Sequence, residues 1–379
     1  MNKKLIFISM FDPESSIAGA VRMQMYSKML DKEGVDFEFY SFQGNKKFNN
    51  RGVGFIKKIL KMINVLIFIF NLRKFINNNT DTVFFYYPIG SVFFEIILLL
   101  YVKSIKKKKI FLEVNEVLKF GVSEKIDKIS MLRYDFLESL SSFYDGIVCI
   151  SKNIEQYYLN YNKNSLLLPI LSDMEQGCIN NSFYRGDSSF KIGFTGSIHI
   201  EKENLITVFK SLKNVVEKGY DVELNLYGLM YEEVRFKNLI DDFKLGSIVK
   251  YHGCIDHDYV FDVLKSQDLL ILPRAKNKQN NYGFSTKLAE YLVSGVPVLL
   301  TDVSDNLYYL TPNLDCLVAD YNSYESFSEK IIFLINNYSV EAPKLSNNAY
   351  NKARLNFSYK SHARRLINFL FNRLDHEFN

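Results

Sequence analysis

The strongest constraint in this sequence is an alternation of short β-rich apolar runs with longer helical patterns, which occurs twice along the chain. The first series extends from KLIFISM (4–10) to SLLLPI (165–170), and the second from FKIGFTGS (190–197) to VPVLLT (296–301). Such alternation is typical of α/β units with a parallel sheet. A chain of 379 residues is also long enough to divide into two domains. The sequence therefore predicts two doubly wound, Rossmann-like α/β domains that face each other across a cleft.

A polar, turn-rich segment separates the two series and predicts the linker. It covers residues 171–189 and has no hydrophobic period. We accordingly expect an N-terminal domain over 1–170 and a C-terminal domain over 190–359. The amphipathic segment SHARRLINFLFNRLDHEF (361–378) predicts a last helix over about 360–379.

Positive charge is concentrated in the first half of the chain. Residues 1–185 hold 25 Lys or Arg against 18 Asp or Glu, whereas residues 186–379 hold 22 against 24. Between Lys46 and Lys109, 13 basic residues interleave with apolar runs and face only two acidic ones. This pattern favours binding to an anionic membrane surface, and the alternative is a solvated helix face over an ordinary core stripe. Nucleic acid is not expected as a partner, because no known binding motif accompanies the charge.

The apolar stretch VFFYYPIGSVFFEIILLLYV (83–102) is long enough to cross a bilayer. Pro88 and Gly90 split it, however, and Glu95 would lie near mid-membrane. We predict a buried strand ending at Pro88 and then a helix, while a membrane-dipping segment at 61–72 or 90–102 stays open. The first apolar run is too short for a signal peptide, and the cysteines lack paired spacing. We therefore expect a cytoplasmic protein, held peripherally at the inner face of the plasma membrane.

The stretch that follows the strand LLILP (269–273) carries the clearest chemical signal. A helix is predicted to begin near Ser285 or Thr286, which are good N-cap residues. Its unpaired N–H groups and the ammonium of Lys287 suit a diphosphate. Glu290 lies one turn deeper on the same face, where a carboxylate can accept hydrogen bonds from two ribose hydroxyls. Taken alone, Lys287 and Glu290 would equally fit a surface ion pair.

This stretch resembles the donor site of the family 4 glycosyltransferases, which are retaining enzymes of the GT-B fold. Thr286-Lys287-Leu288-Ala289-Glu290-Tyr291-Leu292 is similar to the donor-site helix of the branch that carries Lys-x-x-Glu-Tyr. The segment from Gly196 to Lys202 resembles the family's Gly-Arg…Glu-Lys segment, and Ala18-Gly19-Ala20-Val21-Arg22 resembles its glycine loop. The resemblance implies that Glu290 holds the ribose, that Lys202 contacts the diphosphate and that the last helix returns to the first domain.

Some positions depart from the family pattern. Tyr282 stands where a glutamate often contacts the donor sugar, and Ser197 replaces a diphosphate-binding arginine. Arg274 could compensate, or it could be a solvated loop residue. Asn115 and Glu116 stand where relatives often have a histidine near the reacting sugar, so they are the candidate catalytic residues, with Glu116 on the acceptor side. The predicted donor-binding set is Gly19, Ser197, Lys202, Arg274, Tyr282, Gly283, Phe284, Ser285, Thr286, Lys287 and Glu290.

The resemblance implies sugar transfer, with retained configuration, from a UDP- or GDP-linked donor to an acceptor hydroxyl. The basic face of the first domain points to a lipid-linked glycan or oligosaccharide acceptor in bacterial surface polysaccharide synthesis. We expect no cofactor and no metal, and we interpret Asp256 and Asp258 as helix-capping residues rather than a metal-nucleotide motif. A nucleotide-sugar epimerase of the same fold and a non-catalytic sugar-nucleotide-binding subunit remain alternatives.

Overall fold

The computed structural model describes residues 2–15, 17–41, 54–76, 80–88, 90–121, 127–177 and 189–371. The chain divides into two compact units, which are treated separately below. Unit 1 comprises Met1–Pro169 and His362–Asn379, and unit 2 comprises Ile170–Ser361. Each unit contains a six-stranded sheet in which every strand pair is parallel. The predicted fold class, two Rossmann-like α/β units, is confirmed.

The sheet of unit 1 has the strand order β2-β1-β3-β4-β5-β6. Its central strands are nearly continuous apolar runs, because helices cover both faces of a doubly wound sheet. The strands are β1 Asn2–Ser9, β2 Asp36–Ser41, β3 Thr80–Tyr86, β4 Lys109–Val114, β5 Gly146–Cys149 and β6 Ser165–Leu167.

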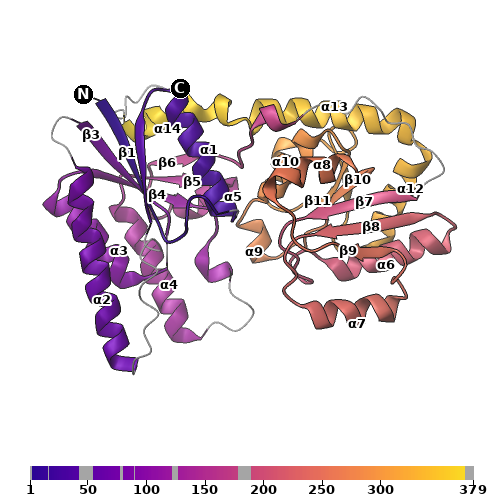
Figure 1. Ribbon diagram of the computed structural model, residues 1–379, viewed down its shortest axis with the longest axis horizontal. Coiled ribbons are helices and arrows are strands. Elements are labelled where there is room, and N and C mark those ends of the chain that lie inside the picture. Colours follow the sequence, from indigo (N-terminus) through magenta and orange to yellow (C-terminus); the bar gives the residue numbers. More distant parts are fainter. Residues whose placement is uncertain are drawn as a thin grey trace. The chain divides into compact units, whose positions relative to one another are not determined.

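Helices and short turns connect these strands. They are α1 Ala18–Lys32, α2 Gly54–Asn71, η2 Leu72–Phe75, α3 Val92–Leu99, the π-helical η3 Leu100–Ile105, η4 Leu118–Phe120, α4 Lys128–Leu140, η5 Ser141–Phe143, α5 Lys152–Tyr158 and α14 Tyr359–Phe371, whose first residues belong to unit 2. Ser91, Asp127 and Ser151 begin α3, α4 and α5 by accepting hydrogen bonds from backbone N–H groups in the first turns. The helices α2, α3 and α4 pack one against the next (Figure 1).

The apolar stretch 83–102 forms the end of β3, the loop at Pro88 and then α3, as the sequence predicted. Glu95 is buried within unit 1 and accepts a hydrogen bond from the Tyr144 hydroxyl at 2.9 Å. Among the residues that the structure describes, no helix combines the length and the apolar character that a bilayer span requires.

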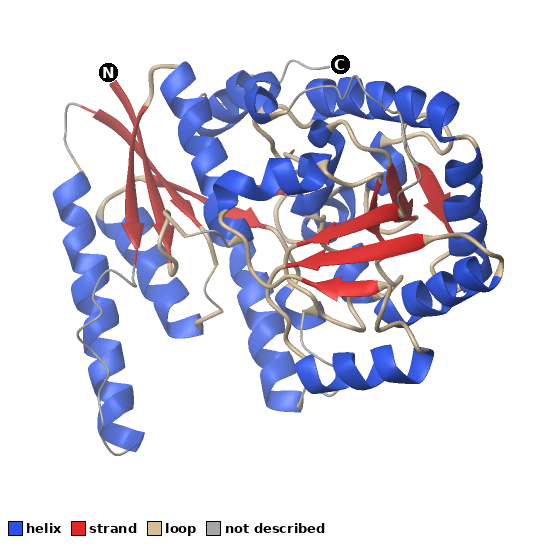
Figure 2. Ribbon diagram, turned by 45° about the vertical axis from the view of Figure 1, so that its right-hand side comes forward, coloured by secondary structure: helices blue, strands red, loops and turns tan. Residues whose placement is uncertain are grey.

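The sheet of unit 2 has the strand order β12-β11-β10-β7-β8-β9. Figure 2 shows its strands in red between layers of helices. The strands are β7 Phe190–Thr195, β8 Val222–Tyr227, β9 Val249–Tyr251, β10 Leu269–Leu272, β11 Val298–Thr301 and β12 Leu317–Ala319. The sequence did not predict β12, whose apolar run is only the four residues 316–319 between two aspartates.

The helices of unit 2 form two groups. In Figure 1, α6 and α7 lie on one side of the sheet, and α8, α10 and α13 lie on the other. The elements are η6 Met174–Gln176, α6 Leu205–Glu217, α7 Glu233–Phe243, η7 His257–Tyr259, α8 Val260–Lys265, α9 Lys278–Asn281, α10 Thr286–Ser294, α11 Asn306–Tyr309, α12 Tyr324–Asn336 and α13 Tyr338–Asn356.

Parts of several sequence predictions fall on residues outside the described ranges. In the expected linker 171–189, residues 178–188 are outside, whereas Ser172 N–H donates to the carbonyl of Phe357 at 2.8 Å. Residues 46–53 of the basic stretch and residues 372–379 of the expected last helix are outside as well.

Candidate functional site

The candidate site of unit 2 lies at the point where the strand order of its sheet reverses. The chain passes from β7 to β8 and β9 on one side and then returns to β10 on the other, so the order reverses between β7 and β10. Doubly wound sheets bind ligands beyond the carboxyl ends of their strands at such a point. The loop after β7 carries Ser197 and Lys202, and Arg274 lies two residues after the end of β10.

A buried carboxylate joins the cations of this site. Glu203 lies in the loop between β7 and α6, and only 1% of its side chain is exposed. Its Oε1 accepts hydrogen bonds from Lys287 Nζ at 3.0 Å and from Arg274 Nη2 at 3.4 Å. Its Oε2 accepts one from Arg274 Nε at 3.4 Å. Burial opposes ionisation, but Lys287 and Arg274 lower the pKa of Glu203 to about 2. Two cations therefore share one carboxylate, which leaves the cluster with net positive charge.

The path of the Lys287 side chain depends on two glycines at the ends of β7 and β8. Gly196 has φ +105°, and a Cβ there would lie 2.6 Å from Lys287 Cε. Gly228 has φ +132°, and a Cβ there would lie 2.0 Å from the Gly196 carbonyl oxygen. Lys287 Nζ lies 4.0 Å from the ring centroid of Phe194 and 3.4 Å from the carbonyl oxygen of Ser197. Larger side chains at either glycine would displace the ammonium.

The helix α10 begins at Thr286, as predicted, but Ser285 does not cap it with its side chain. The Ser285 hydroxyl is buried, and among the described residues it has no hydrogen-bond partner. Tyr291 fixes the helix to β7, since its hydroxyl accepts a hydrogen bond from Thr195 N–H at 2.8 Å. Ser285 and Thr286 thus form the start of α10, where an α-helix leaves its first backbone N–H groups without intrahelical partners.

Glu290 lies one turn into α10 and is partly buried. Burial raises its pKa to about 7, against the opposing effect of Lys287. Lys287 forms its ion pair with Glu203 instead of Glu290. The alternative interpretation of Lys287 and Glu290 as a helix-surface pair is therefore wrong, because Lys287 points to the loop after β7.

The loop before α10 packs into unit 2. Phe284 is buried and stacks on Tyr309, with ring centroids 5.7 Å apart, and the Gly283 carbonyl accepts a hydrogen bond from Ser304. Tyr282 is partly buried and ends the short helix α9. Asn280, which the sequence analysis missed, donates from Nδ2 to the carbonyls of Lys202 at 3.0 Å and Ala275 at 2.8 Å. This amide joins the loops that follow β7 and β10.

The remaining predicted residues lie in unit 1. Gly19 is buried in the first turn of α1, where a Cβ would lie 3.0 Å from the Phe11 ring and 3.1 Å from the Tyr87 hydroxyl. Asn115 follows β4, and its Oδ1 is a buried atom without a hydrogen-bond partner among the described residues. Glu116 is exposed. The three residues lie beyond the carboxyl ends of β1 and β4, which is the ligand-binding edge of the sheet.

Unit 1 also holds a buried charge cluster that the sequence analysis did not predict. Arg22 donates from Nε to Glu113, from Nη1 to the Pro169 carbonyl and from Nη2 to the Leu168 carbonyl. The Tyr26 hydroxyl donates to the second oxygen of Glu113 at 2.7 Å. Burial raises the pKa of Glu113, and Arg22 opposes this shift. Arg22 and Glu113 are 91 positions apart, so no local pattern could reveal the pair.

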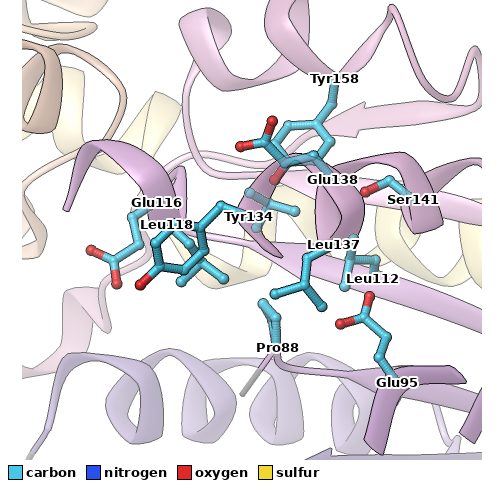
Figure 3. A pocket seen from close by; sticks show the side chains of 11 residues that line it. Pro88, Glu95, Leu112, Glu116, Leu118, Tyr134, Leu137, Glu138, Ser141 and Tyr158 are labelled. Carbon is cyan, nitrogen blue, oxygen red and sulfur yellow. The ribbon is translucent and has the colours of Figure 1, made fainter. Parts of the chain in front are cut away.

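A pocket in unit 1 opens near Glu116 (Figure 3). Its polar lining includes Glu95, Tyr134 and Glu138, while Leu137 and Pro88 are among its apolar residues. The Oε2 atom of Glu138 accepts hydrogen bonds from Lys119 and Tyr157, and its Oε1 is buried without a partner in the described part of the chain.

Within the described residues, no group of three or more His, Cys, Asp or Glu side chains is arranged to hold a metal ion. The segment that contains Asp256 and Asp258 forms the start of η7 and the turn before it, where the Asp256 carbonyl accepts from Tyr259 N–H at 3.0 Å.

The sequence of unit 2 is similar to that of a known protein family. Residues 185–355 match the family model described as "Glycosyl transferases group 1". No curated protein sequence matches the chain. The sequence match covers the cluster around Glu203 and the helix α10, so it coincides with the part of the chain in which the predicted donor site lies.

Solved structures resemble the whole chain. A sucrose-phosphate synthase from Thermosynechococcus elongatus has a TM-score of 0.72 at 12% identity, covering 96% of this chain and 97% of the other. Anabaena Alr3699/HepE in complex with UDP and glucose has a TM-score of 0.72 at 12% identity, covering 97% and 99%. The lipopolysaccharide outer core galactosyltransferase WaaB has a TM-score of 0.68 at 13% identity, covering 98% and 100%. These likenesses show the GT-B fold, and with the family match they support a glycosyltransferase.

Proposed function

We propose that this chain is a retaining, family 4 glycosyltransferase that moves a sugar from a nucleotide-diphosphate sugar to an acceptor hydroxyl. The observation that carries the proposal is the joint position of Lys287, Arg274 and the N-terminus of α10 at the reversal point of the second sheet. Such a set of cationic and N–H donors suits a diphosphate. In this assignment unit 2 binds the donor and unit 1 binds the acceptor.

The proposed chemistry needs stabilisation of the leaving group. Negative charge develops on the β-phosphate as the bond to the sugar breaks, and preorganised donors lower the barrier to this step. Lys287, Arg274, Lys202 and the first amides of α10 supply these donors without a metal ion. Glu290 accepts hydrogen bonds from the ribose hydroxyls of a UDP- or GDP-linked donor.

The acceptor side of the proposal rests on unit 1. Asn115 and Glu116 lie at the carboxyl edge of its sheet and are proposed to contact the acceptor hydroxyl, with Glu116 also handling its proton. The acceptor is proposed to be a lipid-linked glycan of a bacterial surface polysaccharide. One structural neighbour is described as a lipopolysaccharide outer core galactosyltransferase, which supports an acceptor of this class.

The helices of unit 1 support peripheral binding to an anionic membrane. Large apolar side chains are exposed on α2, η3 and α4, which belong to the layer of successive helices on one side of the sheet. Basic side chains lie in the same elements or next to them. The exposed apolar residues are Met62, Ile63, Leu66, Ile67, Phe70, Leu100, Ile105, Ile129, Met131, Leu132 and Phe136. Arg73, Lys74, Lys106, Lys128 and Arg133 are the basic residues.

A second candidate function is a sugar-nucleotide-binding subunit without catalytic activity. Tyr282 in place of a carboxylate and Ser197 in place of an arginine favour it, because both would weaken contacts to the donor sugar and diphosphate. This candidate shares the donor site with the glycosyltransferase and differs only in turnover.

The test is donor binding by the wild-type protein and the Glu290→Ala variant, measured by calorimetry with UDP and GDP. Loss of the ribose hydrogen bonds should weaken binding of the preferred nucleotide about tenfold or more, since each such bond to a carboxylate contributes about 1.5–3 kcal/mol. Glu233→Ala, an exposed carboxylate on α7, is the control and should bind as the wild type does. Unchanged affinity of Glu290→Ala would contradict the site.

Turnover then separates the two candidate functions. Release of the nucleotide from UDP- or GDP-sugars, with and without a lipid-linked acceptor, supports the glycosyltransferase. Tight nucleotide binding without any release or transfer supports the binding subunit.

A further inference from the structure

Glu203 is a buried carboxylate to which the proposed mechanism gives no direct role. The loop from His199 to Asn204 holds it in place: Glu203 N–H donates to the His199 carbonyl at 3.0 Å, and Asn204 adopts φ +52°. Asn204 Nδ2 also donates to the Tyr321 carbonyl at 2.8 Å. A charged carboxylate at this depth is strongly unfavourable unless it is paired. The loop therefore places Glu203 where Lys287 and Arg274 pair with it and Lys202 adds to the compensation of its charge.

We propose that Glu203 is a positioning residue that holds Lys287 and Arg274 together as one clamp for the donor diphosphate. The inference rests on the proposed function, because the diphosphate is that of the donor. The side chains of Lys287 and Arg274 are 12% and 13% exposed, so both pair with Glu203 on their inner sides and still reach solvent. Without the carboxylate, two neighbouring cations would repel each other. Glu203 thereby allows a clamp of two charges to exist before the donor binds.

The protonation of Lys287 gives this role a measurable signature. Burial lowers the pKa of Lys287 to about 8; Glu203 raises it, whereas Arg274 and Lys202 lower it further. Glu290 on the same helix is another titratable group that interacts with Lys287, and its pKa is about 7. Removal of the Glu203 charge should therefore move the pKa of Lys287 to a lower value. The charged fraction of Lys287 in the variant would then fall below that in the wild type by a larger factor at pH 8 than at pH 6.

The experiment compares UDP binding by the wild type and Glu203→Gln at pH 6 and pH 8, by calorimetry at constant ionic strength. The ratio of the two dissociation constants is taken at each pH, so that titration of UDP itself cancels. We expect the variant to bind about tenfold more weakly than the wild type at pH 8, and within about twofold of it at pH 6. Glu203→Asp, which keeps the charge, should restore most of the wild-type pH dependence.

Two further variants test whether the effect passes through Lys287. In a Lys287→Met background, Glu203→Gln should change UDP affinity by the same factor at both pH values, because no titrating ammonium remains. Glu223→Gln, which removes another lysine-paired carboxylate of unit 2, should leave UDP binding unchanged.

A Glu203→Gln effect that is equal at pH 6 and pH 8 would overturn the inference, since a purely structural role predicts such a uniform loss. A pH-dependent effect that persists in the Lys287→Met background would overturn it as well. Absence of UDP and GDP binding by the wild-type protein at both pH values would instead overturn the proposed function.

Discussion

The two units contain buried cation–carboxylate clusters that differ in how completely their hydrogen bonds are closed. In unit 1, Glu113 accepts hydrogen bonds on both oxygens, and three guanidinium nitrogens of Arg22 donate to Glu113 and two backbone carbonyls. In unit 2, the bonds between Arg274 and Glu203 are 3.4 Å long, and Lys287 and Arg274 remain partly exposed. In the first cluster the groups bond to one another and to the backbone. In the second cluster the two cations are still partly exposed.

This difference separates a structural role from a binding role. A closed network has no donor left for a ligand, and its removal strands a buried charge. An open network with net positive charge keeps charged donors that can form hydrogen bonds to an anion. The same residue types therefore serve the stability of unit 1 and the proposed donor binding of unit 2.

The largest effect on stability is predicted for a substitution that removes the ion pair of the closed cluster in unit 1. Glu113→Gln leaves Arg22 buried beside a neutral partner, and we expect the free energy of unfolding to fall by about 3–5 kcal/mol. Glu203→Gln should cost clearly less, because Lys287 and Arg274 can turn towards water. Urea unfolding of both variants measures the contrast. Equal losses for the two variants would contradict the distinction between closed and open clusters.

A smaller effect concerns the pH dependence of stability near the open cluster. Burial raises the pKa of Glu290 from 4.5 to about 7, so the folded state holds this proton over a range where the unfolded state has lost it. Stability due to Glu290 therefore falls as the pH rises from about 4.5 to 7, and the loss persists above that range. Glu290→Gln removes the titration, so its stability relative to the wild type should increase by up to about 3 kcal/mol between pH 4 and pH 8.

Thermal unfolding of the wild type and Glu290→Gln at pH 4, 6 and 8 provides this measurement. Burial also raises the pKa of Glu95 in unit 1 to about 7, so the wild-type curve alone cannot identify the source. The difference between the two proteins isolates Glu290. A constant difference over the whole pH range would show that folding does not raise the pKa of Glu290.

Sequence reasoning predicted what local patterns encode and missed what distant residues create. The apolar runs predicted the strands other than β12, and the stretch around Ser285 predicted the start of α10, because both depend on neighbouring residues. The contacts of Glu203 with Lys287 span 84 positions, and those of Arg22 with Glu113 span 91. Glycine gave the available signal for the open cluster of unit 2, since the positive φ angles of Gly196 and Gly228 make room for Lys287.

The smallest predicted effect extends the comparison to the surfaces of the two units. Leu132 on α4 and Leu355 on α13 are almost equally exposed, at 68% and 67%. Only Leu132 belongs to the apolar and basic helix layer that is proposed to bind the membrane. Leu132→Ser should weaken binding to vesicles with 30% anionic lipid by about 1 kcal/mol, roughly fivefold, because one apolar side chain no longer leaves water. Leu355→Ser should bind as the wild type does. Vesicle flotation measures the binding of both variants. An equal loss of vesicle binding in both would mean that exposed leucines contribute by non-specific hydrophobic binding and not through a defined face of unit 1.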